Sequence, residues 1–291
     1  VVLGHVLALV ALATTAPGVA RATAPADSTA APPPPPVIEI PRQPVVTDTF
    51  QVRRAKLTLR EIIERSIDGE RGKLAGRESM VFTSTVRAVV DFDDRREVVD
   101  AVSRTFASAD GFERSVELGE RTTTYREEDG AWVADPDAES EPGAVEVNSG
   151  RASDFDDLPL WLEATHEFDY ELVDRTVLMG RVIFEIRFRP KSEFRPLPSG
   201  TIWIDTDRYR IIHEEFTFEK NPFPLVIRDL ERLSRHWTEL PTGEWVWTKI
   251  RAEVALRSIP FGPIPDRMVF AIERTDFALD VPYDPHVFGE R

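Results

Sequence analysis

The stretch from Val182 to Arg189 reads Val-Ile-Phe-Glu-Ile-Arg-Phe-Arg, and it decides the fold class. Apolar residues hold every second position, and charged residues hold most of the positions between them. Successive side chains of a β-strand point to opposite faces of a sheet, so this period of two predicts a strand with one buried face.

The same period of two recurs along most of the chain after residue 78. Turn-forming pairs separate the segments, and Asp129-Gly130 is the strongest of them because Gly tolerates the positive φ of a tight hairpin. The pattern predicts ten or eleven strands joined as a meander of consecutive hairpins. The predicted strand segments are 80–92, 98–107, 112–118, 122–127, 131–133, 182–189, 201–205, 209–218, 230–237, 245–256 and 268–279.

Two helices are predicted among these strands. Thr58 and Glu61 have the spacing of a capping box, and apolar residues at helical spacing follow until about Asp68 to Lys73. A second, short helix is predicted over 154–164. The chain is therefore predicted to be mainly β (α+β), with a large curved antiparallel sheet and about two helices on one face. A sheet of this width leaves a hollow that strand side chains do not fill, unless a helix plugs it.

The N-terminal part has a different composition. Residues 1–24 combine an apolar run with small residues, which predicts a signal peptide cleaved near Ala22 or Ala24. A retained membrane anchor is the alternative interpretation. Residues 25–48 are rich in Pro and Ala and predict an extended linker. The folded domain is then expected to span 49–291 as a single unit.

Charge and cysteine content exclude several classes of protein. The net charge is −15, whereas nucleic-acid binders concentrate Lys and Arg, so no nucleic-acid partner is expected. There is no Cys, which excludes disulfides, thiolate metal sites and a Cys nucleophile. No segment after the leader is long and apolar enough to form a membrane-spanning helix, so an integral membrane protein is not expected after cleavage.

Several motifs resemble the LolA/LolB-like superfamily of bacterial periplasmic proteins, which includes outer-membrane lipoprotein carriers. The stretch 200–207, Gly-Thr-Ile-Trp-Ile-Asp-Thr-Asp, is similar to a hairpin common in these sorting proteins. The stretches 125–132, 244–250 and 284–288 resemble three further family segments, with Thr248 where proline is frequent. The likeness covers roughly residues 49–288.

The resemblance implies an unclosed half-barrel whose concave face, covered by helices, holds acyl chains. It implies a function in lipid or lipoprotein transport, within the periplasm of a Gram-negative envelope and in outer-membrane biogenesis. It implies a lipid or lipoprotein acyl chain as ligand and leaves room for an envelope protein partner. The family's ligand-contacting residues have no local motif here that would fix their positions.

Aromatic residues are the best candidates for lining such a cavity, although the same residues fit a plain hydrophobic core. The candidates are Phe82, Phe184, Phe188, Trp203, Phe216, Phe218, Trp245 and Trp247.

The sequence contains no recognisable catalytic motif, and neither a cofactor nor a metal is expected. His213 and Glu215 would share one face of a strand and could form half of a metal site, but no third ligand is visible. Two alternatives to a lipid carrier remain open. One is a structural or sensor module that binds a partner through an exposed sheet edge. The other is an envelope hydrolase that uses His213 or His166.

Overall fold

The computed structural model describes residues 57–74, 76–135, 159–178, 180–221, 227–257 and 265–289. The described residues from Thr58 onward belong to one compact unit. The predicted leader, the predicted linker and residues 154–158 of the predicted second helix lie outside the described residues. Their assignments, and the single domain over 49–291, stay predictions.

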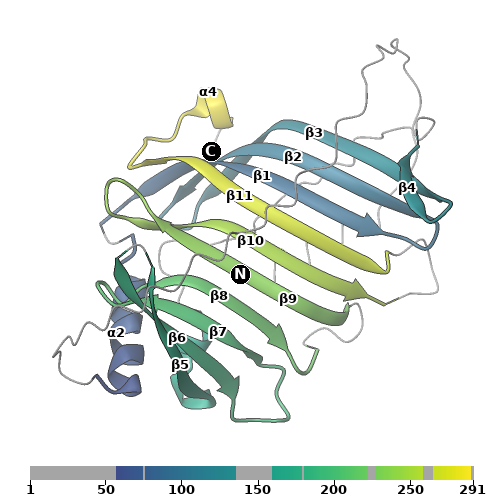
Figure 1. Ribbon diagram of the computed structural model, residues 1–291. Coiled ribbons are helices and arrows are strands. Elements are labelled where there is room, and N and C mark those ends of the chain that lie inside the picture. Colours follow the sequence, from purple (N-terminus) through teal and green to yellow (C-terminus); the bar gives the residue numbers. More distant parts are fainter. Residues whose placement is uncertain are drawn as a thin grey trace. The chain divides into compact units, whose positions relative to one another are not determined.

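The described chain is mainly β, with one antiparallel sheet of eleven strands (Figure 1). The strand order is β4-β3-β2-β1-β11-β10-β9-β8-β7-β6-β5, and in the described part of the chain β4 and β5 are edges, so the sheet is unclosed. This confirms the predicted fold class. The strands are β1 (Ser79–Asp91), β2 (Arg95–Ser108), β3 (Glu113–Glu128), β4 (Ala131–Ala134), β5 (Phe168–Leu178), β6 (Arg181–Pro190), β7 (Pro198–Asp205), β8 (Ile211–Phe218), β9 (Ile227–Glu239), β10 (Trp245–Leu256) and β11 (Arg267–Leu279).

The topology differs from a single meander in one respect. β1 to β4 form one run of hairpins and β5 to β11 form another, and the two runs join where β1 pairs with β11. This pairing connects residues almost 200 positions apart, such as Val86 and Ile272. Local turn signals do not encode such a contact, which is why a simple meander was expected.

The β3–β4 hairpin turns at Asp129 and Gly130, which have φ of 51° and 80°, as the turn motif predicted. The two predicted segments 112–118 and 122–127 are one strand, β3. It passes through an irregularity opposite Val102 and Ser103, where Leu118 is left without a register partner on β2. A β-bulge of this kind keeps the strand continuous although its alternation shifts by one residue.

Helix α2 (Leu59–Arg71) begins with the predicted capping box. The Glu61 amide donates to Thr58 Oγ1 at 3.3 Å, and the Thr58 amide donates to Glu61 Oε2 at 2.7 Å. The helix buries Ile62 and Ile63 and ends before Gly72, within the predicted range.

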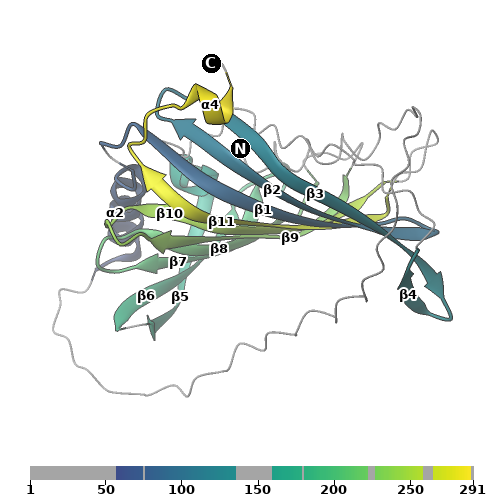
Figure 2. The ribbon, with the colours of Figure 1, turned by 90° about the horizontal axis from the view of Figure 1, so that it is seen from above.

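Three further helical turns are short: α3 (Leu160–Glu163), the 3-10 turn η1 (Thr165–Glu167) and α4 (Pro285–Phe288). α2 contacts α3 and β5, and Figure 1 shows α2 beside the β5 end of the sheet. α4 contacts β3 (Figure 2), and its Phe288 packs with Val81 and Phe106.

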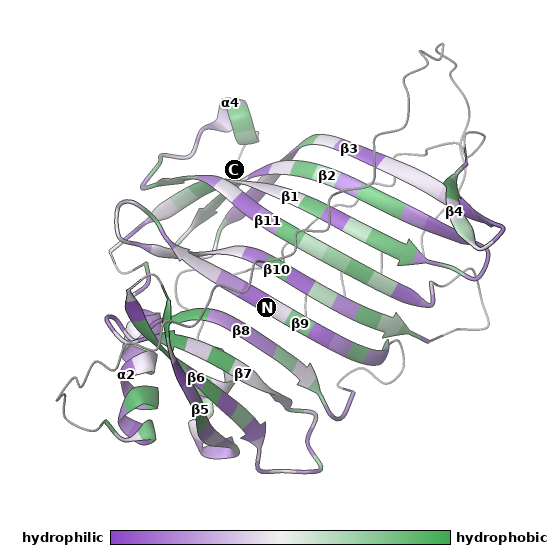
Figure 3. Cartoon of the chain, in the orientation of Figure 1, coloured by the Kyte–Doolittle hydropathy of each residue, from purple (hydrophilic) through white to green (hydrophobic). Residues whose placement is uncertain are grey.

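The two faces of the sheet follow from the register. Phe82, Val86 and Val90 lie on one face of β1. Residues paired in register lie on the same face of the sheet, and following the pairs from strand to strand shows that Ile186 and Phe188 of β6 share this face. We call it the inward face, because Trp161 of α3 packs against it. The outward face carries Arg87 and Val81, and α4 lies on that side. Figure 3 shows the alternation of hydrophobic and hydrophilic residues along the strands that produces these faces.

Candidate functional site

The predicted aromatic residues do not all lie in one place. Six of them are buried, with relative exposures of 9% or less: Phe82, Phe184, Phe188, Phe216, Trp245 and Trp247. Phe218 is half-buried, and its ring lies edge-on to that of Phe216 with centroids 6.0 Å apart. Trp203 alternates with the buried residues Ile202 and Ile204 and so lies on the outward face, 4.6 Å from the ring of His213.

Strands β5 to β8 together with α3 form what we call the packed region. Here Trp161 of α3 stacks on Phe188 with ring centroids 4.7 Å apart and lies 5.2 Å from Phe216. Phe168 meets the ring of Phe188 from its edge at 5.9 Å. The Tyr170 hydroxyl donates to the Trp161 carbonyl, and burial raises the pKa of Tyr170. The inward face is therefore filled by the protein's own rings in this region.

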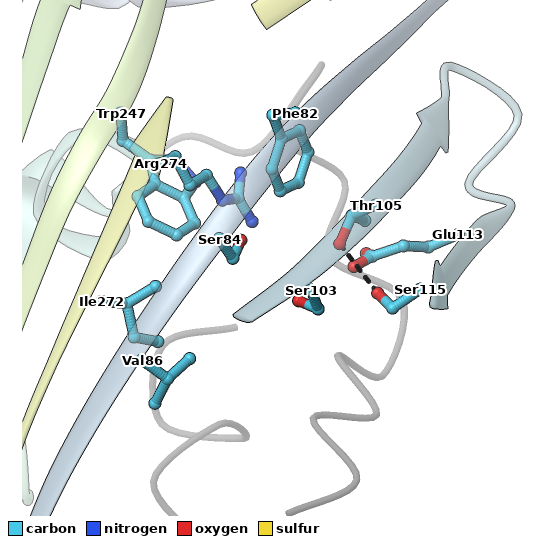
Figure 4. A pocket seen from close by; sticks show the side chains of 10 residues that line it. All are labelled: Phe82, Ser84, Val86, Ser103, Thr105, Glu113, Ser115, Trp247, Ile272 and Arg274. Atoms are coloured by element: carbon cyan, nitrogen blue, oxygen red, sulfur yellow. Dashed lines mark hydrogen bonds between the residues drawn. The ribbon is translucent and has the colours of Figure 1, made fainter. Parts of the chain in front are cut away.

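Strands β1, β2, β3, β10 and β11 form a different environment, which we call the cavity region. A cavity of about 20 Å³ lies on the inward face, between the rings of Phe82 and Trp247 on one side and polar groups of β2 and β3 on the other (Figure 4). Its polar lining consists of Ser84, Ser103, Thr105, Glu113, Ser115 and Arg274. Thr105 and Ser115 are joined by a hydrogen bond of 2.8 Å.

Arg274 is the main cation of this cavity, and only 6% of it is exposed. Its guanidinium carbon lies 3.9 Å from the ring centroid of Phe82 and 3.3 Å from that of Trp247. In Figure 4 the guanidinium lies between these two rings. The β1–β11 pairing places it beside Ser84. Two aromatic faces thus hold the guanidinium plane in a fixed orientation, through cation–π attraction.

A second cavity of about 20 Å³ shares Trp247 and Arg274 with the first and is also lined by Lys73, Trp237 and Trp245. The Lys73 ammonium lies 4.2 Å from the ring centroid of Trp237 and 2.5 Å from a carboxylate oxygen of Glu70. Burial lowers the pKa of Lys73 to about 8, and the attraction of Glu70 opposes that shift.

The last turn of α2 is tied to the sheet by a buried charge, and a second buried charge lies nearby on β8. Glu70 Oε1 accepts from the Ile211 amide at 2.7 Å, which fixes the last turn of α2 to the start of β8. Glu214 is fully buried and pairs with Arg235 at 2.7 Å. Burial raises the pKa of the Glu214 carboxyl, while the charge of Arg235 opposes the shift.

Beyond Arg274 the inward face is apolar on β1, β10 and β11, whereas the neighbouring β2 places Glu97 opposite Val90. Three successive register pairs of β1 and β11 follow the Ser84–Arg274 pair, namely Val86 with Ile272, Ala88 with Phe270 and Val90 with Met268. Ile250, Ala252 and Val254 of β10 extend these rows by one strand. All nine of these residues are buried. The rows and the first cavity together form a surface with one polar end and one apolar end.

The histidines do not converge on a metal site. His213 Nε2 lies 3.2 Å from Glu215 Oε1 on the outward face, as their spacing predicted, and its ring stacks on that of His236 at 3.8 Å. The His166 side chain is 80% exposed. Within the described ranges no group of three His, Asp or Glu residues is placed to hold a metal ion.

Sequence reasoning missed the polar half of the site. Arg274 follows Phe270 and Ile272 at a spacing of two, so the alternation itself places it inward. Lys73 and Trp161 carry no comparable signal, because only the contacts of α2 and α3 with the sheet bring them to this face.

A protein family of unknown function, DUF5686, matches residues 158–262, which run from α3 to just past β10. This is less than half of the chain. A comparison of the sequence with curated proteins gives no match. Among the described residues, no helix is long and apolar enough to cross a membrane.

Several solved structures are distantly similar. A LolA superfamily protein from Nitrosomonas europaea has a TM-score of 0.36 and 11% identity, over 80% of this chain and 98% of that chain. A putative outer membrane lipoprotein-sorting protein domain from Vibrio parahaemolyticus has a TM-score of 0.34 and 11% identity, over 77% and 95%. The MucA/MucB complex of Pseudomonas aeruginosa gives 0.22 and 10% identity, over 76% and 99%. Scores this low carry no argument about what the present chain binds.

Proposed function

We propose that this protein is a non-enzymatic carrier in a bacterial periplasm that binds an acyl chain on its inward face. The acyl chain would belong to a lipid or to a lipid-modified protein. The observation that carries the proposal is the apolar surface formed by the register pairs from Val86–Ile272 to Val90–Met268, on a sheet left unclosed at both edges. Apolar ligands bind by removing such surface from water.

The dimensions of this surface suit one acyl chain. Val90 lies six positions after Ser84, which corresponds to about 20 Å along a strand. Acyl chains span one leaflet of a bilayer core, which is about 15 Å thick, so this length can accommodate one chain. Because Val86, Ala88 and Val90 are buried, the acyl chain must displace the groups that cover them. That step lowers the affinity below what the apolar area alone would give.

The direct test is binding of a fluorescent fatty acid to the purified full-length protein, with native mass spectrometry to count bound acyl chains. We expect saturable binding of one chain and displacement by palmitic acid. Absence of saturable binding, and no acyl chain in the mass spectrum, would overturn the proposal.

A matched pair of variants on β1 locates the binding face. Val90→Thr places a hydroxyl on the inward face, and Val89→Thr places the same hydroxyl on the outward face. An unbonded hydroxyl against an acyl chain costs on the order of 1 kcal/mol, so we expect about fivefold weaker binding for Val90→Thr only. Equal affinity of the two variants would place the ligand elsewhere.

One observation favours a second candidate function, binding of a protein partner at the β5 edge. In the described part of the chain β5 pairs only with β6, and its Val173, Val177 and Leu178 are 40%, 69% and 52% exposed. An edge with exposed apolar residues can accept a further strand. Val177→Lys should abolish crosslinking to an envelope protein if this edge is the interface, and should leave it unchanged if it is not.

A further inference from the structure

We infer that the cavity at Arg274 recognises the carboxylate head group of a single-chain fatty acid whose acyl chain follows the apolar rows of β1, β10 and β11. The inference rests on the proposed function and adds the chemistry of the head group. It assigns Arg274 as the residue that sets specificity.

The first argument is the placement of polar groups. On the inward face of the β1–β11 pair, the Ser84–Arg274 step is polar, and the three register pairs that follow are apolar. The cavity opens on that polar step, where Arg274, Ser84 and Ser103 supply hydrogen-bond donors. An amphiphile with one charged end matches this sequence of environments.

The second argument is the sign of the charge. A guanidinium offers five N–H donors in a planar fork that matches a carboxylate, and the ring centroids of Phe82 and Trp247 lie within 3.9 Å of its central carbon. Lys73 lines the adjoining cavity and adds a second cation. Lys73 is paired with Glu70, and Glu113 lines the first cavity, so the attraction for an anion comes from the guanidinium itself and not from an excess of cations.

The third argument is size. About 20 Å³ is more than the roughly 10–15 Å³ that holds one water molecule, so the cavity takes a small polar group rather than a large one. A phosphate, with three terminal oxygens and an ester oxygen, requires more room. The acyl chain itself lies outside the cavity, along Val86, Ala88 and Val90.

Glu113 lines the same cavity, and its substitution tests whether the bound head group is negatively charged. The Glu113 carboxylate has the same sign of charge as the inferred head group. Glu113→Gln keeps the shape of the side chain and removes the charge, so it should strengthen binding of a carboxylate by reducing like-charge repulsion.

The test compares three ligands with the same acyl chain on the full-length protein: palmitic acid, palmityl alcohol and palmityl phosphate. We expect palmitic acid to bind about tenfold tighter than the alcohol, since a hydrogen bond between two charged groups is stronger than one to a neutral hydroxyl. We also expect palmityl phosphate to bind more weakly than palmitic acid. Arg274→Gln should remove the preference for the acid and Arg274→Lys should restore part of it, whereas Arg251→Gln, on the exposed outward face of β10, should change nothing.

Equal binding of palmitic acid and the alcohol would overturn the head-group inference and leave acyl-chain binding intact. Tighter binding of the phosphate than of the acid would also overturn it. Absence of binding of all three ligands would overturn both this inference and the proposed function. Should Arg274→Gln fail to fold, Glu113→Gln decides the matter, because unchanged or weaker binding of palmitic acid by that variant contradicts a carboxylate in the cavity.

Discussion

The packed region and the cavity region lie on the same inward face of one sheet, yet they are completed in different ways. In the packed region Trp161 of α3 fills the space above Phe188 and Phe216 with aromatic contacts. In the cavity region the corresponding space contains Arg274, hydroxyl groups and two small cavities. Under the proposed function, the packed region stabilises the fold and the cavity region binds the ligand.

The largest effect that tests this comparison is expected from Trp161→Ala. Trp161 is 3% exposed, and removal of a buried Trp side chain costs about 3–5 kcal/mol because a cavity remains. Chemical denaturation should show this loss, whereas Phe194→Ala, at an 86% exposed position, should change stability by less than about 0.5 kcal/mol. A loss below about 1 kcal/mol for Trp161→Ala would show that α3 does not hold the packed region together.

The next effect concerns the buried ion pair between the two regions. Arg235→Gln leaves the fully buried Glu214 without its cation, which should cost about 3 kcal/mol in the free energy of unfolding. Lys249→Gln breaks a pair of similar length, 2.8 Å to Glu273, whose side chains are both more than half exposed. That variant should lose at most about 1 kcal/mol. Equal losses for the two variants would contradict a stabilising role for the buried pair.

One substitution made in both halves of the sheet gives the third effect. A Cβ on Gly200 of β7 would clash with the carbonyl oxygen of Glu215 and lie 2.7 Å from Phe216 Cα. A Cβ on Gly119 of β3 would meet no atom within 4 Å. Gly200→Ala should therefore cost about 2 kcal/mol and Gly119→Ala about zero, as measured by thermal unfolding. Comparable losses at both sites would mean that close strand packing does not distinguish the two regions.

The smallest effect is a dependence on pH. Because burial lowers the pKa of Lys73 to about 8, the native state loses this proton at a pH where the unfolded chain still holds it. Between pH 8 and about 10 the free energy of unfolding should rise by about 1 kcal/mol per pH unit from this group. Lys73→Met should lack that rise, and the control Lys249→Met should keep it. Parallel pH profiles of wild type and Lys73→Met would show that Lys73 is not buried as a charged group.

The sequence predicts every strand except β5 (Phe168–Leu178), and most of the strand faces, because a period of two is a local property. β5 is largely exposed, and apolar and polar residues alternate in it only as far as Leu172, so it lacks the sustained alternation of the other strands. The sequence also determines where Trp203 points, because its neighbours Ile202 and Ile204 are apolar and point to the opposite face of β7. Choosing cavity candidates by aromatic content alone overlooked this alternation. The β1–β11 pairing is not encoded locally, and so neither is the approach of Phe82 to Arg274. The same reason explains why Lys73 and Trp161 were not identified: helices bring them to the inward face through tertiary contacts.

The account depends most on the acyl chain lying in the cavity region, and photocrosslinking with a fatty acid that carries a diazirine near its methyl end tests this directly. With the head group at Arg274, the diazirine should label peptides that contain Val90 or Met268, as identified by mass spectrometry. Labelling should compete with unmodified palmitic acid. Labels confined to the β5 edge or to α3, or labels that palmitic acid does not reduce, would contradict the account.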